Sequence, residues 1–329
     1  MKLSQRFLFS LLLLCTPAWL SANLPGFDLN AENVSAFIDD MTREHKFKRD
    51  ELEALLGKAR LHQSILDAIS RPAESKPWYE YQPIFLTQDR IRGGVKFWQK
   101  HDDILQAAEQ KFRVPPHIIT AIIGVETRYG RHTGRYPVLD SLATLAFAYP
   151  PRSRFFRSEL EHYLLMTREE KLDPLEQYGS YAGAMGMPQF ISSSFRSYAV
   201  DFDNNGQRDL WNSPADAIGS VANYFHRHGW QHGQPVVQRV QVRGDDYRKL
   251  LNSGLKPTHT VAELRQHGVV IPSSIAADQK VSLMELEGKA GPEYWLGWNN
   301  FYVISRYNRS ALYSLAVYQL SLEILEAME

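Results

Sequence analysis

The sequence predicts a mainly helical α+β protein in which a small β-rich segment interrupts the helices. Apolar residues recur at helical spacing over most of the chain, valine-rich runs with polar loops follow Gly233, and helical spacing returns near Leu312. The 329 residues exceed what one small core usually holds, so we expect one elaborated domain or two to three packed subdomains. The hydrophobic share of 44% and charged share of 22% are typical of a soluble globular protein.

The N-terminus has the pattern of a secretory signal peptide. Two basic residues precede the apolar run from Phe7 to Leu14, and small residues follow at Ser21 and Ala22. The run is too short for a membrane span. We therefore expect residues 1–22 to be removed after Ala22 and the mature protein to be exported to the periplasm, with no transmembrane segment left.

Cys15 is the only cysteine in the chain. A lipoprotein signal would have a small residue just before its cysteine, whereas Leu14 stands there. We interpret Cys15 as part of the apolar run rather than as a lipid anchor. The mature chain then has no cysteine, which excludes disulfides and thiolate catalysis.

Residues 31–70 predict two amphipathic helices, the second from the spacing of Leu52 to Leu61. Pro72 and Pro77 indicate a linker that also contains Trp78, Tyr79 and Tyr81. We place an N-terminal helical domain at residues 23–90.

Residues 91–232 are expected to be mostly helical. Proline needs no amide partner in the first helical turn, so the Pro115-Pro116 pair predicts a helix start. Another helix is predicted from Asp216 to Phe225.

Residues 233–298 are expected to form a small β-rich domain. Strands are predicted at Val236–Val242, Val269–Ile271 and Val281–Leu286. Residues 299–329 are expected to return to the helical core, with a last helix from about Leu312 to the C-terminus.

Charge and motifs exclude several function classes. Lys+Arg and Asp+Glu balance at 37 each, so no global basic field points to nucleic acid. No glycine-rich phosphate loop follows a strand, so nucleotide binding is not supported. No Gly-x-Ser-x-Gly motif occurs, so the sequence gives no sign of a serine nucleophile elbow. His226, His228 and His232 suggest a solvated helix end more than a metal site.

Glu126 is the only carboxylate in the largely apolar run Ile118–Gly130. On a helix, Ile119, Ile122, Ile123 and Glu126 fall on one face, which should be buried. Burial raises the pKa of a carboxyl group, and a glycosidase acid must still hold its proton near neutral pH. Spacing alone leaves open a core glutamate paired with Arg128 or Arg131.

The glycine-rich segment from Tyr178 to Phe190 permits close approach to the backbone. Ser180 and Gln189 could hydrogen-bond a sugar or its acetamido group. Tight turns and close helix packing are the alternative explanation.

Residues 201–212 have the pattern of a calcium-binding loop. Asp201, Asp203 and Asn205 offer oxygen ligands at positions 1, 3 and 5, Gly206 follows, and Gln207 would give its backbone carbonyl. Position 12 departs from the pattern, since it is an asparagine. We expect a structural Ca²⁺ site and keep a surface turn rich in Asx residues as the alternative.

Four motifs together resemble the lytic murein transglycosylase B family. They are Gly124-Val-Glu126-Thr, Tyr181-Ala-Gly-Ala-Met-Gly with Gln189-Phe190, Ala222-Asn-Tyr224-Phe and Arg306-Tyr307-Asn308. Their order is that of the family, and the match spans roughly residues 75–329. The resemblance implies a lysozyme-like catalytic core at 91–232, no organic cofactor, and peptidoglycan glycan strands as the binding partner.

The resemblance assigns roles to individual residues. Glu126 matches the catalytic acid/base, and Asp216 would be the last calcium ligand, making the loop 201–216. Met187-Pro188 stands where the family has Tyr-Gly. Separately, we consider Arg152 and Arg154 candidates for contacts to peptide stems. The residues that match the sugar cleft are Ser180, Gln189, Tyr224, Tyr307, Asn308 and Tyr313.

A single carboxylate requires help from the substrate. The acetamido group of N-acetylmuramic acid can support an oxocarbenium-like centre, and the 6-hydroxyl of the same sugar can attack it. Glu126 would protonate the leaving oxygen and then deprotonate that hydroxyl, giving a 1,6-anhydro end. The alternatives are a muramidase that uses water and a non-catalytic peptidoglycan-binding protein.

Overall fold

The computed structural model describes residues 25–71, 76–251 and 254–329. The predicted signal peptide and Cys15 lie outside the described residues. Within the described residues, no helix combines the length and the apolar character that crossing a membrane requires.

Three short helices, not two, form the N-terminal region. Helix α2 ends before Gly57, and the amides of residues 57–59 still donate back to its last turn. The next two amides bond to other segments: Arg60 N–H donates to Asp140, and Leu61 N–H donates to the carbonyl of Pro25. These tertiary bonds replace the helical bonds that the leucine spacing predicted. The helices are α1 (Glu32–His45), α2 (Arg49–Leu56) and α3 (Gln63–Ile69).

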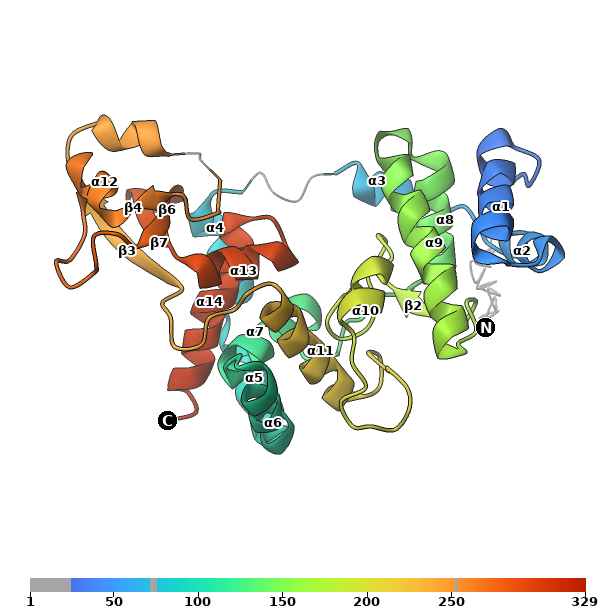
Figure 1. Cartoon of the computed structure of the whole chain (residues 1–329), viewed down its shortest axis with the longest axis horizontal. Coiled ribbons are helices and arrows are strands. Elements are labelled where there is room, and N and C mark those ends of the chain that lie inside the picture. Colours follow the sequence, from blue (N-terminus) through green and yellow to red (C-terminus); the bar gives the residue numbers. More distant parts are fainter. Residues whose placement is uncertain (1–24, 72–75, 252–253) are drawn as a thin grey trace, which may run out of the picture.

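These helices pack against a long helical hairpin, on the right in Figure 1. The shared hydrophobic cluster includes Phe37, Phe156 and Tyr163, each almost completely buried. The hairpin and the elements beside it are α8 (Val138–Ala148), η1 (Pro150–Arg152), α9 (Ser153–Glu170) and α10 (Ser192–Tyr198).

A second hydrophobic cluster forms around α7 (Pro116–Thr127), which begins at Pro116 as predicted. Trp78 and Tyr81 belong to this cluster, so the predicted linker is wrong at this point: they lie in helix α4, and Trp78 is only 3% exposed. The other helices of the cluster are α4 (Trp78–Phe85), α5 (Gln88–Lys100), α6 (Asp102–Phe112), α11 (Pro214–Arg227), α13 (Asn299–Tyr307) and α14 (Ala311–Glu326).

A five-stranded antiparallel sheet lies at the left of Figure 1, with strand order β4-β6-β7-β3-β5. The three predicted strands are present, and two more were missed. One of these, β7, pairs with β6 across a two-residue turn between Gly288 and Gly291. The strands are β3 (Val237–Val242), β4 (His259–Thr260), β5 (Val269–Val270), β6 (Lys280–Gly288) and β7 (Gly291–Gly297).

Smaller elements complete the fold. The five-stranded sheet packs with η2 (Asp246–Leu250) and α12 (Val261–Gln266) around a third hydrophobic cluster. A separate two-stranded sheet joins β1 (Tyr136–Pro137) to β2 (Tyr178–Gly179). The prediction of a mainly helical α+β fold is confirmed.

The C-terminal helix brings the end of the chain back to the centre of the fold. Helix α14 begins at Ala311, close to the predicted start, and packs against α7, α4 and α5. This packing places the first turn of α14 beside the C-terminal end of α7.

Candidate active site

Glu126 is the penultimate residue of α7. The isoleucines predicted to share its face, Ile119, Ile122 and Ile123, are fully buried, and Glu126 itself is partly buried. Desolvation raises the pKa of Glu126 to about 7. The carboxyl group is therefore poised to exchange a proton near neutral pH.

The partner of Glu126 is a tyrosine, not an arginine. Within the described residues, neither Arg128 nor Arg131 forms an ion pair with it. Instead the hydroxyl of Tyr313, which is 3% exposed, donates a hydrogen bond of 2.5 Å to Glu126 Oε1. This bond lowers the pKa of Glu126, but the effect of burial is larger. Burial and the nearby carboxylate in turn raise the pKa of Tyr313 well above its usual value.

A pocket of about 210 Å³ opens beside Glu126. It is lined by residues from α7, α10, α11 and α13 and from the segment that leads into α10. The hydroxyls of Tyr224 and Tyr307 are both held by backbone carbonyls at 2.6 Å, those of Arg306 and Pro188. The pocket is lined by Glu126, Gln189, Phe190, Ile191, Ser194, Tyr224, Arg306, Tyr307 and Asn308.

Gln189 is fixed in the wall of the pocket. Its φ angle of 52° lies in the left-handed region. Its Nε2 atom donates to the carbonyls of Thr133 at 3.1 Å and Gly186 at 2.9 Å. Both amide hydrogens are thus used, and Oε1 is the atom that the side chain offers to a ligand.

The glycine-rich segment lies against residues 201–216, called the acidic loop below. Gly186 has a φ of 67°, and a Cβ atom there would lie 2.4 Å from the carbonyl oxygen of Leu210. The next amide, Met187 N–H, donates to the same carbonyl at 2.8 Å. Glycine is therefore required here both for its backbone angle and for close approach.

Ser180 organises the glycine-rich turn. Its hydroxyl accepts the N–H groups of Ala182 at 3.3 Å and Ala184 at 3.0 Å. Ser180 is not among the residues that line the pocket.

Arg152 and Arg154 also lie outside that lining. Both are exposed near the start of α9. The guanidinium of Arg152 lies over the rings of Phe155, at 4.6 Å, and Phe156, at 5.0 Å.

Four lining residues, Phe190, Ile191, Ser194 and Arg306, were not assigned a role from the sequence. Phe190 follows Gln189 in a recognised motif. Arg306 directly precedes Tyr307 in a recognised motif, which was a usable signal. Ile191 and Ser194 belong to the start of α10, and only the packing of α10 against its neighbours brings them to the pocket.

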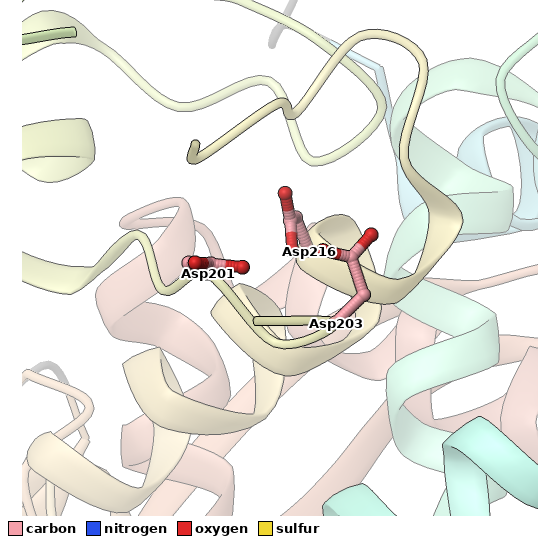
Figure 2. A group of neighbouring side chains, drawn as sticks. All are labelled: Asp201, Asp203 and Asp216. Atoms are coloured by element: carbon pink, nitrogen blue, oxygen red, sulfur yellow. The ribbon is translucent and has the colours of Figure 1, made fainter. Parts of the chain in front are cut away.

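A second cluster of carboxylates lies in the loop before α11. Figure 2 shows Asp201, Asp203 and Asp216 directed toward one another, with one oxygen of each within 4.8 Å of the others. Asp216, in the first turn of α11, is fully buried. It accepts the N–H of Phe202 at 2.7 Å and that of Asp209 at 2.8 Å. Burial nevertheless raises the pKa of Asp216.

The donor set of this loop fits a hard cation. No ion pair links any of the three aspartates to a Lys, Arg or His among the described residues. Asx-type bonds also occur, since Asp201 accepts the N–H groups of Asn205 and Gly206. Such bonds do not require three carboxylates to converge, whereas carboxylate oxygens are the ligands that Ca²⁺ prefers.

Comparisons with known proteins identify the family to which this chain is similar. The family model described as "Transglycosylase SLT domain" matches residues 30–322. The chain is 43% identical over 301 residues to membrane-bound lytic murein transglycosylase B of Escherichia coli K12, covering 88% of this chain and 82% of that protein.

Solved structures share the fold. Soluble lytic transglycosylase SltB1 from Pseudomonas aeruginosa is 52% identical with a TM-score of 0.85, over 89% of this chain and 98% of that one. Escherichia coli Slt35 in complex with calcium is 42% identical with a TM-score of 0.84, over 93% and 96%. SltB3 from Pseudomonas aeruginosa in complex with NAG-anhNAM-pentapeptide is 32% identical with a TM-score of 0.76, over 87% and 77%.

Proposed function

This chain belongs to the transglycosylase SLT domain family and is a peptidoglycan lytic transglycosylase, and we propose that Glu126 is its single acid/base. The observation that carries the proposal is the placement of Glu126: it is partly buried, its pKa is raised to about 7, and it faces a pocket. Among the described residues that line this pocket, it is the only carboxylate.

Glu126 first acts as a general acid. With a pKa of about 7, a substantial fraction of the enzyme holds the proton at neutral pH. Glu126 donates that proton to the oxygen of the glycosidic bond between N-acetylmuramic acid and N-acetylglucosamine, and the bond to the anomeric carbon breaks. The carbonyl oxygen of the acetamido group supports the electron-poor anomeric carbon.

Glu126, now a carboxylate, then acts as the base. It takes the proton from the 6-hydroxyl of the muramic acid, and the oxygen of that hydroxyl bonds to the anomeric carbon. Attack within one ring has a high effective concentration, so water is not needed. The product is a 1,6-anhydro end, and Glu126 regains its starting proton.

The absence of a second carboxylate from the described pocket lining favours this route over a muramidase. An inverting hydrolase would use a second carboxylate to activate water, and most retaining ones use it as the nucleophile. Conversely, a protein that only binds glycan has no need for a carboxyl group with a pKa near 7.

The pocket offers separate contacts to the sugar. Gln189 Oε1 can accept a hydrogen bond from a hydroxyl or from the acetamido N–H. The rings of Tyr224 and Tyr307, which meet at 60° with centroids 4.9 Å apart, give an aromatic wall to the sugar. Ser180 and Asn308 both carry polar side chains that could orient the acetamido group, and Asn308 is favoured because it lines the pocket whereas Ser180 does not. Arg152 and Arg154 remain candidates for contacts to peptide stems farther along the strand.

The acidic loop is proposed to hold a structural calcium ion. The ligands would be the carboxylates of Asp201, Asp203 and Asp216, the side chain of Asn205 and the backbone carbonyl of Gln207. The calcium complex of the similar Escherichia coli Slt35 supports this assignment. When bound, the ion would neutralise three converging carboxylates and tie the loop to α11.

The expected place of action is the cell wall in the periplasm, reached through the signal peptide at residues 1–22. The SltB3 complex with NAG-anhNAM-pentapeptide supports glycan strands with peptide stems as the substrate.

We also propose a division of the chain into four parts: a helical domain (23–90), a core (91–232), a β-rich domain (233–298) and a segment that returns to the core (299–329).

Digestion of purified sacculi tests the function. Wild-type protein should release soluble muropeptides, and Glu126→Gln should release almost none. Binding of sacculi without release by the wild-type protein would instead support the non-catalytic alternative.

A further inference from the structure

Thr127, the residue after Glu126, links the catalytic helix to the opposite wall of the pocket. Its side chain is buried, at 1% exposure. Its hydroxyl donates to the carbonyl of Met187 at 2.9 Å and accepts the N–H of Gly130 at 3.0 Å. The carbonyl of Ile123, one turn back in α7, is farther away at 3.2 Å.

The segment that Thr127 reaches leads directly to Gln189, and it is held from three directions. The acidic loop holds Met187 through its N–H, which donates to the carbonyl of Leu210. Thr127 holds the carbonyl of the same residue. Tyr307, from α13, donates to the carbonyl of Pro188. Of these three anchors, Thr127 is the one that comes from the helix carrying Glu126.

Two hydrogen bonds connect the walls of the pocket: the bond from Thr127 to Met187, and the bond from Gln189 Nε2 to the carbonyl of Thr133, which follows α7. Glu126 and Gln189 are 63 residues apart in sequence. One lies at the end of a helix and the other in an irregular segment with a left-handed backbone. The spacing between the proton donor and the sugar-binding amide therefore depends on bonds that bridge α7 and this segment.

We propose that Thr127 is a positioning residue that fixes the place of the Gln189 wall relative to Glu126, so that a bound sugar presents its glycosidic oxygen to the acid. This inference rests on the proposed function of the pocket. It assigns no contact with substrate to Thr127 itself. The proposed role depends on the hydroxyl of Thr127, because its O–H donates to the carbonyl of Met187 while its oxygen accepts the N–H of Gly130.

The experiment compares Thr127→Val with Thr127→Ser. Valine keeps the shape of threonine but removes the hydroxyl, whereas serine keeps the hydroxyl. The Thr127→Val variant should have a higher KM. Its kcat/KM should fall by about tenfold or more, since small errors in the placement of a substrate have effects of this size. Serine should stay within about twofold of wild type.

A matched control separates positioning from general stability. Thr144 in α8 is also fully buried, accepts the N–H of His62 at 3.2 Å and donates to the carbonyl of Arg60 at 3.4 Å, outside the pocket lining. Thr144→Val should lower the melting temperature yet leave kcat and KM unchanged at temperatures where the protein is folded. Equal losses of activity in Thr144→Val and Thr127→Val would overturn the proposal.

A binding measurement distinguishes this proposal from the function on which it rests. In the Glu126→Gln background, where turnover should be absent, Thr127→Val should weaken binding of a NAG-anhNAM-pentapeptide fragment by calorimetry. If Glu126→Gln still turns over, the proposed function fails. If Glu126→Gln is inactive, but Thr127→Val changes neither binding in that background nor turnover in the wild-type background, only the role of Thr127 is refuted.

Discussion

The hydroxyl of Tyr313 donates a 2.5 Å hydrogen bond to Oε1 of Glu126 across a sequence separation of 187 residues. Helix α14 returns the end of the chain to the centre of the fold and thereby supplies this donor. The bond stabilises the carboxylate, while burial stabilises the protonated acid. An acid/base that must pass through both forms in one cycle benefits from this balance.

Replacing Tyr313 by phenylalanine tests that balance. Loss of the hydrogen bond to the carboxylate should raise the pKa of Glu126 further, above about 7. The acid form would then persist to higher pH, so the alkaline limb of the kcat/KM profile should move upward. A profile measured on soluble glycan strands checks this; an unmoved or lowered alkaline limb would show that Tyr313 does not tune the acid.

Replacing Glu126 by glutamine should reduce turnover by roughly two orders of magnitude or more, because the amide cannot deliver a proton. The fold should survive, since glutamine has nearly the same size and still accepts the hydrogen bond from Tyr313. Release of muropeptides and circular dichroism are the measurements. Near-normal turnover in a folded Glu126→Gln protein would refute the assignment of the acid/base.

The same substitution should change how stability depends on pH. The pKa of Glu126 is about 7 in the folded protein against 4.5 for an exposed glutamate, so the folded state binds the extra proton. The stability that the folded wild-type protein gains by holding this proton is fully present below pH 4.5 and is lost as pH rises to about 7. Glutamine does not titrate, so its stability relative to wild type should increase over this window by up to about 3 kcal/mol.

Urea unfolding at pH 4.5 and pH 8 measures that difference. Glu323, exposed on α14, provides a control, because Glu323→Gln removes a carboxyl group at the surface of the protein. A wild-type protein and a Glu126→Gln variant with the same pH dependence would indicate that burial does not perturb Glu126.

Calcium should stabilise the protein, because a ligand that binds only the folded state raises stability by mass action. Addition of calcium to chelator-treated protein should raise the melting temperature. The double variant Asp201→Ala with Asp203→Ala should lose this response. Magnesium should have less effect, since it demands a tighter octahedral site. Identical melting curves with and without calcium would favour the Asx-turn explanation of the loop.

The sequence was most informative where the relevant contacts are local. The spacing of Ile119, Ile122, Ile123 and Glu126 predicted a carboxylate on a buried face because one helix determines that geometry. The convergence of Asp201 and Asp203 was foreseeable for a similar reason, as both lie in one short loop.

Contacts between distant segments could not be derived in this way. Periodicity left Arg128 or Arg131 as partners of Glu126. The family resemblance gave Tyr313 only as a residue of the sugar cleft, and its bond to Glu126 is visible only in the structure. The second N-terminal helix was predicted too long: it ends at Leu56, and the amides of Arg60 and Leu61 bond to other segments instead of continuing it. Ser194 lines the pocket through the packing of α10, which leaves no mark on local spacing.

The product formed in heavy-oxygen water tests the central claim most directly. Sacculi are digested by the wild-type protein in H₂¹⁸O, and the muropeptides are weighed by mass spectrometry. If Glu126 is the only carboxylate needed and the 6-hydroxyl attacks, each new muramic acid end is an anhydro sugar, one water lighter than the hydrolytic product and free of ¹⁸O. Reducing muramic acid ends that carry ¹⁸O would show that water is the nucleophile and would contradict the account.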